Sequence, residues 1–124
     1  MKSYTDISQS KKLAEILPID SADMGYAGEE EDSIFCGFGD VEQELYTDYG
    51  DGHPCWSLAA LLDLLPTITK GKENANPFIA KTQDNKYYVV YATFTEEVDS
   101  SAICDNPVDA CVDMVISLYK LKML

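Results

Sequence analysis

The spacing of apolar positions predicts three helices along the chain. The first covers residues 5–17, where Thr5 or Asp6 can cap the start and Pro18 ends the helix. The second covers residues 55–65 and follows Pro54, a residue suited to a first helical turn. Nearly all of its residues are apolar, so we expect it to be covered on most sides. Trp56 anchors its start, and its expected buried face consists of Leu58, Leu61, Leu62 and Leu65.

The third helix is predicted to begin at Asn106, which is a good N-cap residue. Pro107 fits the first helical position, and Asp109 lies near the positive end of the helix dipole. Apolar residues then recur every three or four positions, as on the buried face of an amphipathic helix. These residues are Val108, Cys111, Val112, Val115, Leu118 and Tyr119.

Two segments rich in β-branched and aromatic residues predict a β-hairpin. Residues 78–82 and 86–94 flank a turn at 83–85, and the second segment has the composition of a central strand. Residues 67–76 before it are polar and predict a connection without regular structure. Two further short strands are expected at residues 33–38 and 42–46, between glycine turns. The pattern as a whole predicts a single α+β domain over residues 1–124, with a small antiparallel sheet and two or three helices packed on one face.

The charge of the chain is concentrated in one region. The 124 residues carry a formal net charge of −13. Residues 13–69 hold thirteen of the 22 carboxylates and no basic residue except His53, whereas the rest of the chain is balanced. This region also contains most of the glycines and several aromatic residues, which separates it from a disordered acidic tail. We therefore expect a folded, strongly electronegative surface.

This charge excludes several classes of function. The nine basic residues are all lysines, and arginine is the usual reader of phosphates and guanine edges. We therefore expect no direct binding to nucleic acid and none to an anionic membrane. The apolar runs are too short to span a bilayer, and no signal-peptide pattern is visible at the start. We expect a soluble, cytoplasmic protein.

The four cysteines raise the question of a thiol or metal site. His53 and Cys55 are the only histidine and cysteine close in sequence, so Cys55 could act as a nucleophile. A zinc site could also be built from Cys36, His53, Cys55, Cys104 and Cys111. The spacings match no zinc signature, and no third group that would orient His53 is identifiable. The acidic segment 48–52 likewise lacks the ligand order of a calcium loop. We expect reduced, structural thiols, no metal, no cofactor and no enzymatic activity.

The acidic region contains the best candidate for a binding site. Residues 29–32 form a run of four carboxylates that we expect in a solvated loop, with aromatic residues following. Aromatic side chains inside an acidic rim are typical of protein-binding surfaces, and packing against the sheet is the alternative for them. The candidate partner-binding residues are Glu29, Glu30, Glu31, Asp32, Phe38, Tyr46 and Tyr49.

Three segments carry a resemblance to a known group of proteins. Residues 10–18 (SKKLAEILP), 55–66 (CWSLAALLDLLP) and 106–112 (NPVDACV) together resemble small uncharacterised proteins from phages and mobile elements of gut bacteria. These are helix-packing motifs, and no catalytic or binding residue can be transferred from them. The resemblance implies an accessory protein of a mobile element.

The sequence leaves three functions open. The first is a non-enzymatic module that binds a protein partner with a basic surface. The second is an acidic mimic of nucleic acid that occupies the basic site of a DNA-binding protein, and it requires carboxylates spread over one exposed face. The third is a thiol or metal enzyme that uses Cys55. Clustering of the carboxylates in one loop would favour the first function over the second.

Overall fold

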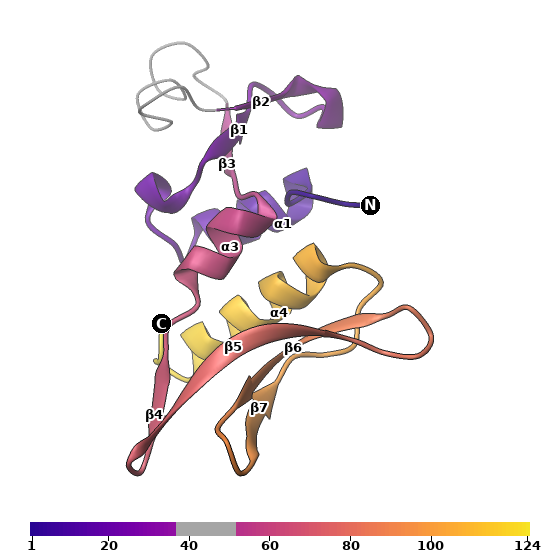
Figure 1. Cartoon of the computed structure of the whole chain (residues 1–124). Coiled ribbons are helices and arrows are strands. Elements are labelled where there is room, and N and C mark those ends of the chain that lie inside the picture. Colours follow the sequence, from indigo (N-terminus) through magenta and orange to yellow (C-terminus); the bar gives the residue numbers. More distant parts are fainter. Residues whose placement is uncertain (37–51) are drawn as a thin grey trace. The chain divides into compact units, whose positions relative to one another are not determined.

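Residues 1–36 and 52–124 are described by the computed structural model of the chain (Figure 1). These residues form three α-helices and two antiparallel sheets, one of three strands and one of four. The expected α+β class is confirmed, with two small sheets in place of the expected single one. The chain divides into two compact units. We call residues 3–60 the N-terminal unit, and residues 61–124 with Met1 and Lys2 the C-terminal unit.

The N-terminal unit contains helix α1 and the three-stranded sheet. The strands lie in the order β2-β1-β3, and α1 packs against β3. The core of the unit is formed by Ile7, Tyr26 and Cys55, which lie on α1, β1 and β3. The elements are α1 (Ile7–Ala14), the short 3-10 helices η1 (Ile19–Ser21) and η2 (Glu31–Ser33), and the strands β1 (Met24–Tyr26), β2 (Ile34–Cys36) and β3 (His53–Cys55).

Helix α1 begins where the sequence predicted and is shorter than expected. The Asp6 side chain accepts a hydrogen bond from the Gln9 backbone N–H, and the Gln9 side chain accepts one from the Asp6 N–H. This reciprocal capping satisfies two N–H groups that have no partner within the helix. The helix ends at Ala14, four residues before Pro18, and Leu13 and Leu17 are buried.

Strand β1 depends on a glycine at its centre. Gly25 lies opposite Phe35 of β2, and a Cβ atom at Gly25 would lie only 2.5 Å from Cζ of the Phe35 ring. The ring therefore lies over a position that any other residue would fill. The short strand predicted at residues 33–38 is observed as β2, whereas the strand predicted at residues 42–46 lies outside the described residues.

The helix predicted to start at Cys55 begins later, so that prediction was wrong. Helix α3 spans Leu58–Leu64, and Pro54 and Cys55 belong instead to strand β3, where they pair with β1. Ser57 supplies the N-terminal cap, because its hydroxyl accepts a hydrogen bond from the Ala60 N–H at 3.1 Å. The boundary between the two units falls inside α3.

The burial expected for this helix is confirmed only in part. Trp56 is fully buried just before the helix, and Leu61 and Leu65 are buried. Leu62 was expected on the buried face and is exposed instead, as are Ala59 and Asp63. The helix therefore has an exposed side, contrary to the prediction that it is covered on most sides.

The C-terminal unit contains a four-stranded antiparallel sheet with helix α4 packed against β6. The strands follow one another in sequence order, β4-β5-β6-β7. The predicted hairpin is confirmed as β5–β6, with β6 an interior strand, and its turn places Asn85 in the left-handed region (φ 61°). The elements are β4 (Ile68–Lys70), β5 (Glu73–Lys81), β6 (Tyr87–Ala92), β7 (Glu97–Ser100) and α4 (Pro107–Lys120).

The polar stretch 67–76 is not an irregular connection, as was predicted. It contains β4 and the first residues of β5, joined by a tight turn in which Gly71 has φ 65°. Strand β7 was also not predicted. Helix α4 begins as expected, because the Asn106 side chain accepts a hydrogen bond from the Asp109 N–H. Its predicted apolar face is buried except for Tyr119, which is exposed.

Candidate functional site

The acidic run of residues 29–32 lies in the turn between β1 and β2. The loop predicted before the strand at residues 33–38 is therefore confirmed, whereas strand β1 was not predicted. Ser33 fixes the shape of this turn: its backbone N–H and its hydroxyl both donate to the Glu30 carbonyl, at 3.0 and 2.6 Å. The Gly28 N–H donates in turn to the Ser33 hydroxyl at 3.2 Å. Four backbone and side-chain groups thus hold the loop, so the carboxylates project from a defined backbone.

Glu31, one of the predicted binding residues, is held by contacts within the N-terminal unit. One of its carboxylate oxygens accepts a hydrogen bond from the Tyr26 hydroxyl at 3.0 Å, and the other accepts from the Ile7 N–H at 3.0 Å. Ile7 is the first residue of α1, whose N–H groups need acceptors from outside the helix. Glu31 therefore ties the acidic turn to β1 and to the start of α1.

Glu29 joins two basic groups on the surface of the same unit. Its carboxylate oxygens lie 2.6 Å from Nζ of Lys11 and 2.6 Å from Nε2 of His53. The hydrogen bond from Lys11, and after it the one from His53, lowers the pKa of Glu29 below its ordinary value. Although Glu29 is exposed, both of its carboxylate oxygens already have a basic partner within the unit.

Glu30 and Asp32 differ from their two neighbours. Both are exposed, and neither side chain has a hydrogen-bond or ion-pair partner within residues 1–36 and 52–124. The structure therefore places four predicted residues in one turn and leaves two of their carboxylates available to a partner. The predicted Phe38, Tyr46 and Tyr49 lie outside the described residues.

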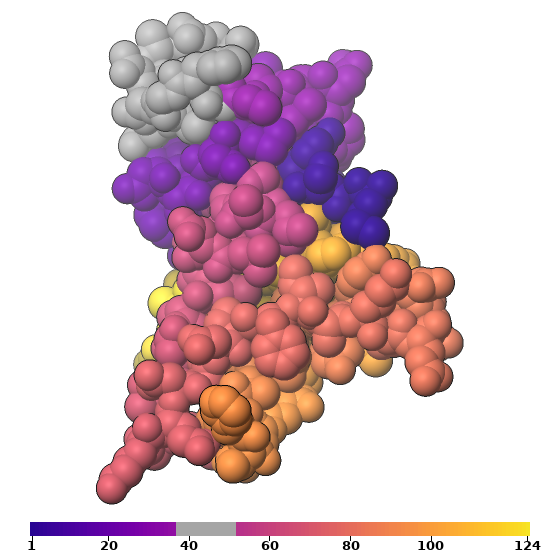
Figure 2. Space-filling view, in the orientation of Figure 1, coloured from indigo at the N-terminus to yellow at the C-terminus, as the bar shows by residue number. Residues whose placement is uncertain are grey.

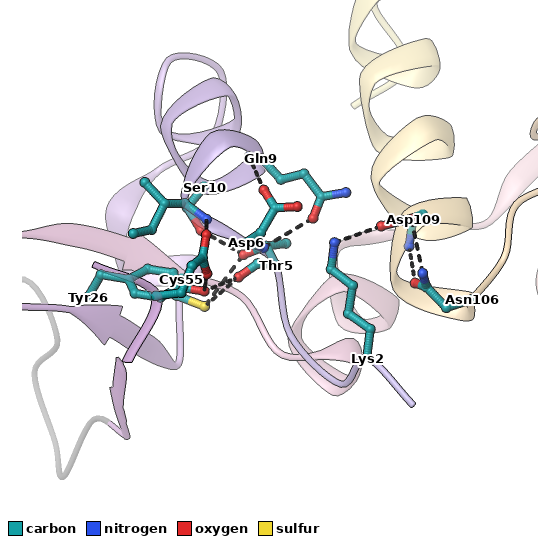
Figure 3. A network of polar contacts seen from close by, with 11 residues as sticks. Lys2, Thr5, Asp6, Gln9, Ser10, Tyr26, Cys55, Asn106 and Asp109 are labelled. Carbon is teal, nitrogen blue, oxygen red and sulfur yellow. Dashed lines mark hydrogen bonds and ion pairs between the residues drawn. The ribbon is translucent and has the colours of Figure 1, made fainter. Parts of the chain in front are cut away.

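A buried polar network holds the N-terminal unit together, and the sequence did not reveal it. Figure 3 shows Thr5, Ser10, Tyr26 and Cys55 directed toward one another. The Thr5 and Ser10 hydroxyls lie 2.8 Å apart, and the Tyr26 hydroxyl donates to the Thr5 carbonyl at 2.7 Å. The Cys55 thiol donates to the same carbonyl at 3.4 Å. Thr5, a predicted cap residue, is instead fully buried at the centre of this network.

The environment of Cys55 does not suit a nucleophile. The thiol is fully buried, and burial raises its pKa above the ordinary value, which disfavours the reactive thiolate. His53, on the same strand, is engaged with Glu29. Burial likewise raises the pKa of Tyr26, which keeps its hydroxyl protonated as a hydrogen-bond donor.

No metal site is formed by the part of the chain that the structure describes. In residues 1–36 and 52–124, no three side chains of the His, Cys, Asp and Glu type lie close enough together to hold an ion. None of the four cysteines forms a disulfide. Cys55 and Cys111 are buried, Cys104 is half-buried and Cys36 is exposed.

Comparisons with known protein families, with curated proteins and with solved structures found no significant match to this chain. Among the described residues, no helix has the length and apolar character needed to cross a membrane.

Proposed function

We propose that the chain is a non-enzymatic protein-binding module whose acidic turn, residues 29–32, contacts a basic surface on its partner. The observation that carries this proposal is the division of roles within the turn. Glu31 fixes the turn to Tyr26 and to the start of α1, while Glu30 and Asp32 remain exposed without a partner in the described chain. Because the backbone of the turn is already fixed, binding through these two carboxylates costs side-chain entropy but little backbone entropy.

The same geometry favours a module over a nucleic-acid mimic. A mimic presents carboxylates over an extended face, in the manner of phosphates along a strand. Here two of the four carboxylates of the run, Glu29 and Glu31, are engaged within the unit and are not free to imitate phosphates. The buried thiol of Cys55 gives no support to the enzyme alternative. An accessory role in a mobile element stays a prediction.

Two double variants that remove the same number of charges at different positions test this proposal. Glu30→Gln/Asp32→Asn removes two charges from the turn, and the matched control Glu15→Gln/Asp20→Asn removes two exposed charges elsewhere in the same unit. Each protein is immobilised and used to capture partners from a lysate of the source organism, with quantification by mass spectrometry. We expect at least one basic protein to be retained by the wild type and by the control and to be lost with the turn variant.

Association and dissociation rates of the captured partner then test whether the acidic turn attracts it electrostatically and contacts it directly. Electrostatic steering predicts an on-rate that falls by roughly threefold or more at low salt in the turn variant and that converges with the wild type as salt is raised. Direct contact by Glu30 and Asp32 also predicts a faster off-rate. Identical captured proteins for the turn variant and its control would contradict the proposal.

A further inference from the structure

The four-stranded sheet of the C-terminal unit has one face without a helix. Strand alternation places Ala75, Val89 and Tyr91 on one face of the sheet, where all three are fully buried, and helix α4 packs against β6. The residues between them in sequence point to the opposite face, which we call the outer face. In Figure 1, β5 passes in front of α4, and Figure 2 shows the strands from this open side.

The outer face is uncharged along β4, β5 and β6. A quarter of the chain consists of charged residues, yet the charged residues of these three strands, Lys70, Glu73 and Lys81, all fall on the α4 side of the register. Glu97 on the edge strand β7 pairs with Ala92. At the neighbouring turn, Glu73 accepts a hydrogen bond from the Thr95 hydroxyl at 3.3 Å, and Lys70 lies 2.8 Å from Glu96. The outer-face residues of the three strands are Thr69, Asn74, Asn76, Phe78, Ala80, Tyr88, Val90 and Ala92.

An open hollow of about 310 Å³ lies on this face. It is lined by Asn74, Asn76, Ala92, Thr93 and Phe94. The Phe94 side chain is fully exposed, and Phe78, two residues beyond Asn76 on the same face, is half exposed. Apolar side chains that are exposed together and rimmed by polar residues mark binding surfaces. The volume lies at the lower end of the range for small-ligand pockets.

Two side-chain amides in the hollow present free donors. The Thr67 hydroxyl donates to Oδ1 of Asn76 at 2.8 Å, and the Thr69 hydroxyl donates to Oδ1 of Asn74 at 3.2 Å. Each amide is thereby oriented by a threonine. The Nδ2 groups of both asparagines have no acceptor within the described residues, and both side chains are exposed. Two oriented N–H donors therefore lie beside a flat aromatic ring.

We propose that this hollow binds a neutral carbohydrate. Sugar hydroxyls accept hydrogen bonds from amide N–H groups, and the C–H face of a sugar ring packs against an aromatic ring. The outer-face residues of the three strands include no cation, and Lys70, which reaches the turn at residues 93–96, is paired with Glu96 at 2.8 Å, so an anionic ligand finds no free counter-charge there. An open hollow of this size fits weak binding, with a Kd on the order of 0.1–1 mM.

The test uses affinity electrophoresis of the full chain in gels that contain a soluble polysaccharide. The probes are neutral polymers (a β-glucan, a xylan, a mannan and a starch) and one anionic polymer, polygalacturonate. We expect at least one neutral polymer to retard the wild type, with no effect of raised salt. Phe94→Ala should weaken that binding by about tenfold or more. Asn76→Asp keeps the acceptor for Thr67 while it removes the donor, and it should weaken binding similarly.

Two controls separate the outcomes. Tyr119→Ala removes an exposed aromatic residue of the same unit from α4 and should leave retardation unchanged. Circular dichroism verifies that each variant is folded. The proposal is overturned if no neutral polymer retards the folded wild type, if only polygalacturonate does, or if Tyr119→Ala weakens binding as much as Phe94→Ala. It is also overturned if sedimentation shows a dimer that Phe94→Ala dissociates, because the face would then bind a second copy.

Discussion

Trp56→Ala is expected to destabilise the protein by about 3–5 kcal/mol. The Trp56 side chain is fully buried, and its indole Nε1–H donates to the Ser21 hydroxyl at 2.9 Å. A tryptophan side chain buries roughly 150–250 Å², and at about 25 cal/mol per Å² this corresponds to roughly 4–6 kcal/mol as an upper estimate. Collapse of neighbouring side chains into the cavity reduces the loss, which gives the lower range observed for substitutions of this type.

Trp56→Phe separates packing from hydrogen bonding. It keeps most of the aromatic volume and removes the donor to Ser21, so it should cost about 1–2 kcal/mol. Trp56 is the only tryptophan of the chain, so urea denaturation of all three proteins is followed by circular dichroism rather than by fluorescence. The wild-type fluorescence should shift to longer wavelength on unfolding. A loss below about 1 kcal/mol for Trp56→Ala, with an unchanged urea slope, would refute this account of the packing.

Three further predictions concern a helix cap, alkaline pH and metal. Ser57→Ala should lower the free energy of unfolding by about 1–2 kcal/mol in urea denaturation, because Ser57 caps α3 and is held by Asp23. As a control, Ser8→Ala at an exposed position should lower it by less than about 0.5 kcal/mol. Burial raises the pKa of Cys111 from 9.0 to about 12 and that of Tyr91 from 10.0 to about 12. The unfolded chain therefore loses these protons first, so the urea midpoint should be constant between about pH 6 and pH 8 and fall from there to pH 12, more gently in Cys111→Ala. A flat profile would contradict this. A chelator should leave the melting temperature unchanged, and stoichiometric zinc in the purified protein would show that the thiols are ligands.

The elements that the sequence predicted well are those with local signals. Helix α4 has its cap, its proline and its apolar repeat within fifteen residues, so its start at Asn106 needed no knowledge of the remaining chain. The β5–β6 hairpin likewise connects neighbouring segments through a short turn. Such elements are specified by contacts close in sequence, which a pattern can show.

The errors fall where pairing with distant residues decides the structure. Strands β1 and β3 have only three residues each, and β3 exists because it pairs with Met24–Tyr26, about thirty residues earlier. Pro54 was interpreted as the first turn of a helix. Proline is equally suited to an edge strand, and β3 lies at the edge of its sheet. Nothing in the local sequence distinguishes these two positions.

The candidate site shows the same limit. The sequence correctly placed residues 29–32 in a loop before a strand, yet it could not separate Glu31 from Glu30. The partners of Glu31 are the Tyr26 hydroxyl, five residues away, and the Ile7 N–H, 24 residues away. The hollow was missed for a related reason, because residues 67–76 were assigned to an irregular connection. Only the strand register aligns Asn74 and Asn76 with Ala92 on one face.

The two proposed surfaces differ in charge, and this difference makes them separable by experiment. The N-terminal unit carries thirteen carboxylates and two lysines, whereas the C-terminal unit carries nine carboxylates and seven lysines, including Lys2. Binding through the acidic turn should weaken as salt screens the charges, because the Debye length shortens from about 10 Å at 0.1 M to about 3 Å at 1 M. Binding in the uncharged hollow should be indifferent to the same change. Glu30→Gln/Asp32→Asn should therefore leave polysaccharide retardation intact, and Phe94→Ala should leave partner capture intact. If either variant impaired both activities, the two surfaces would not act independently.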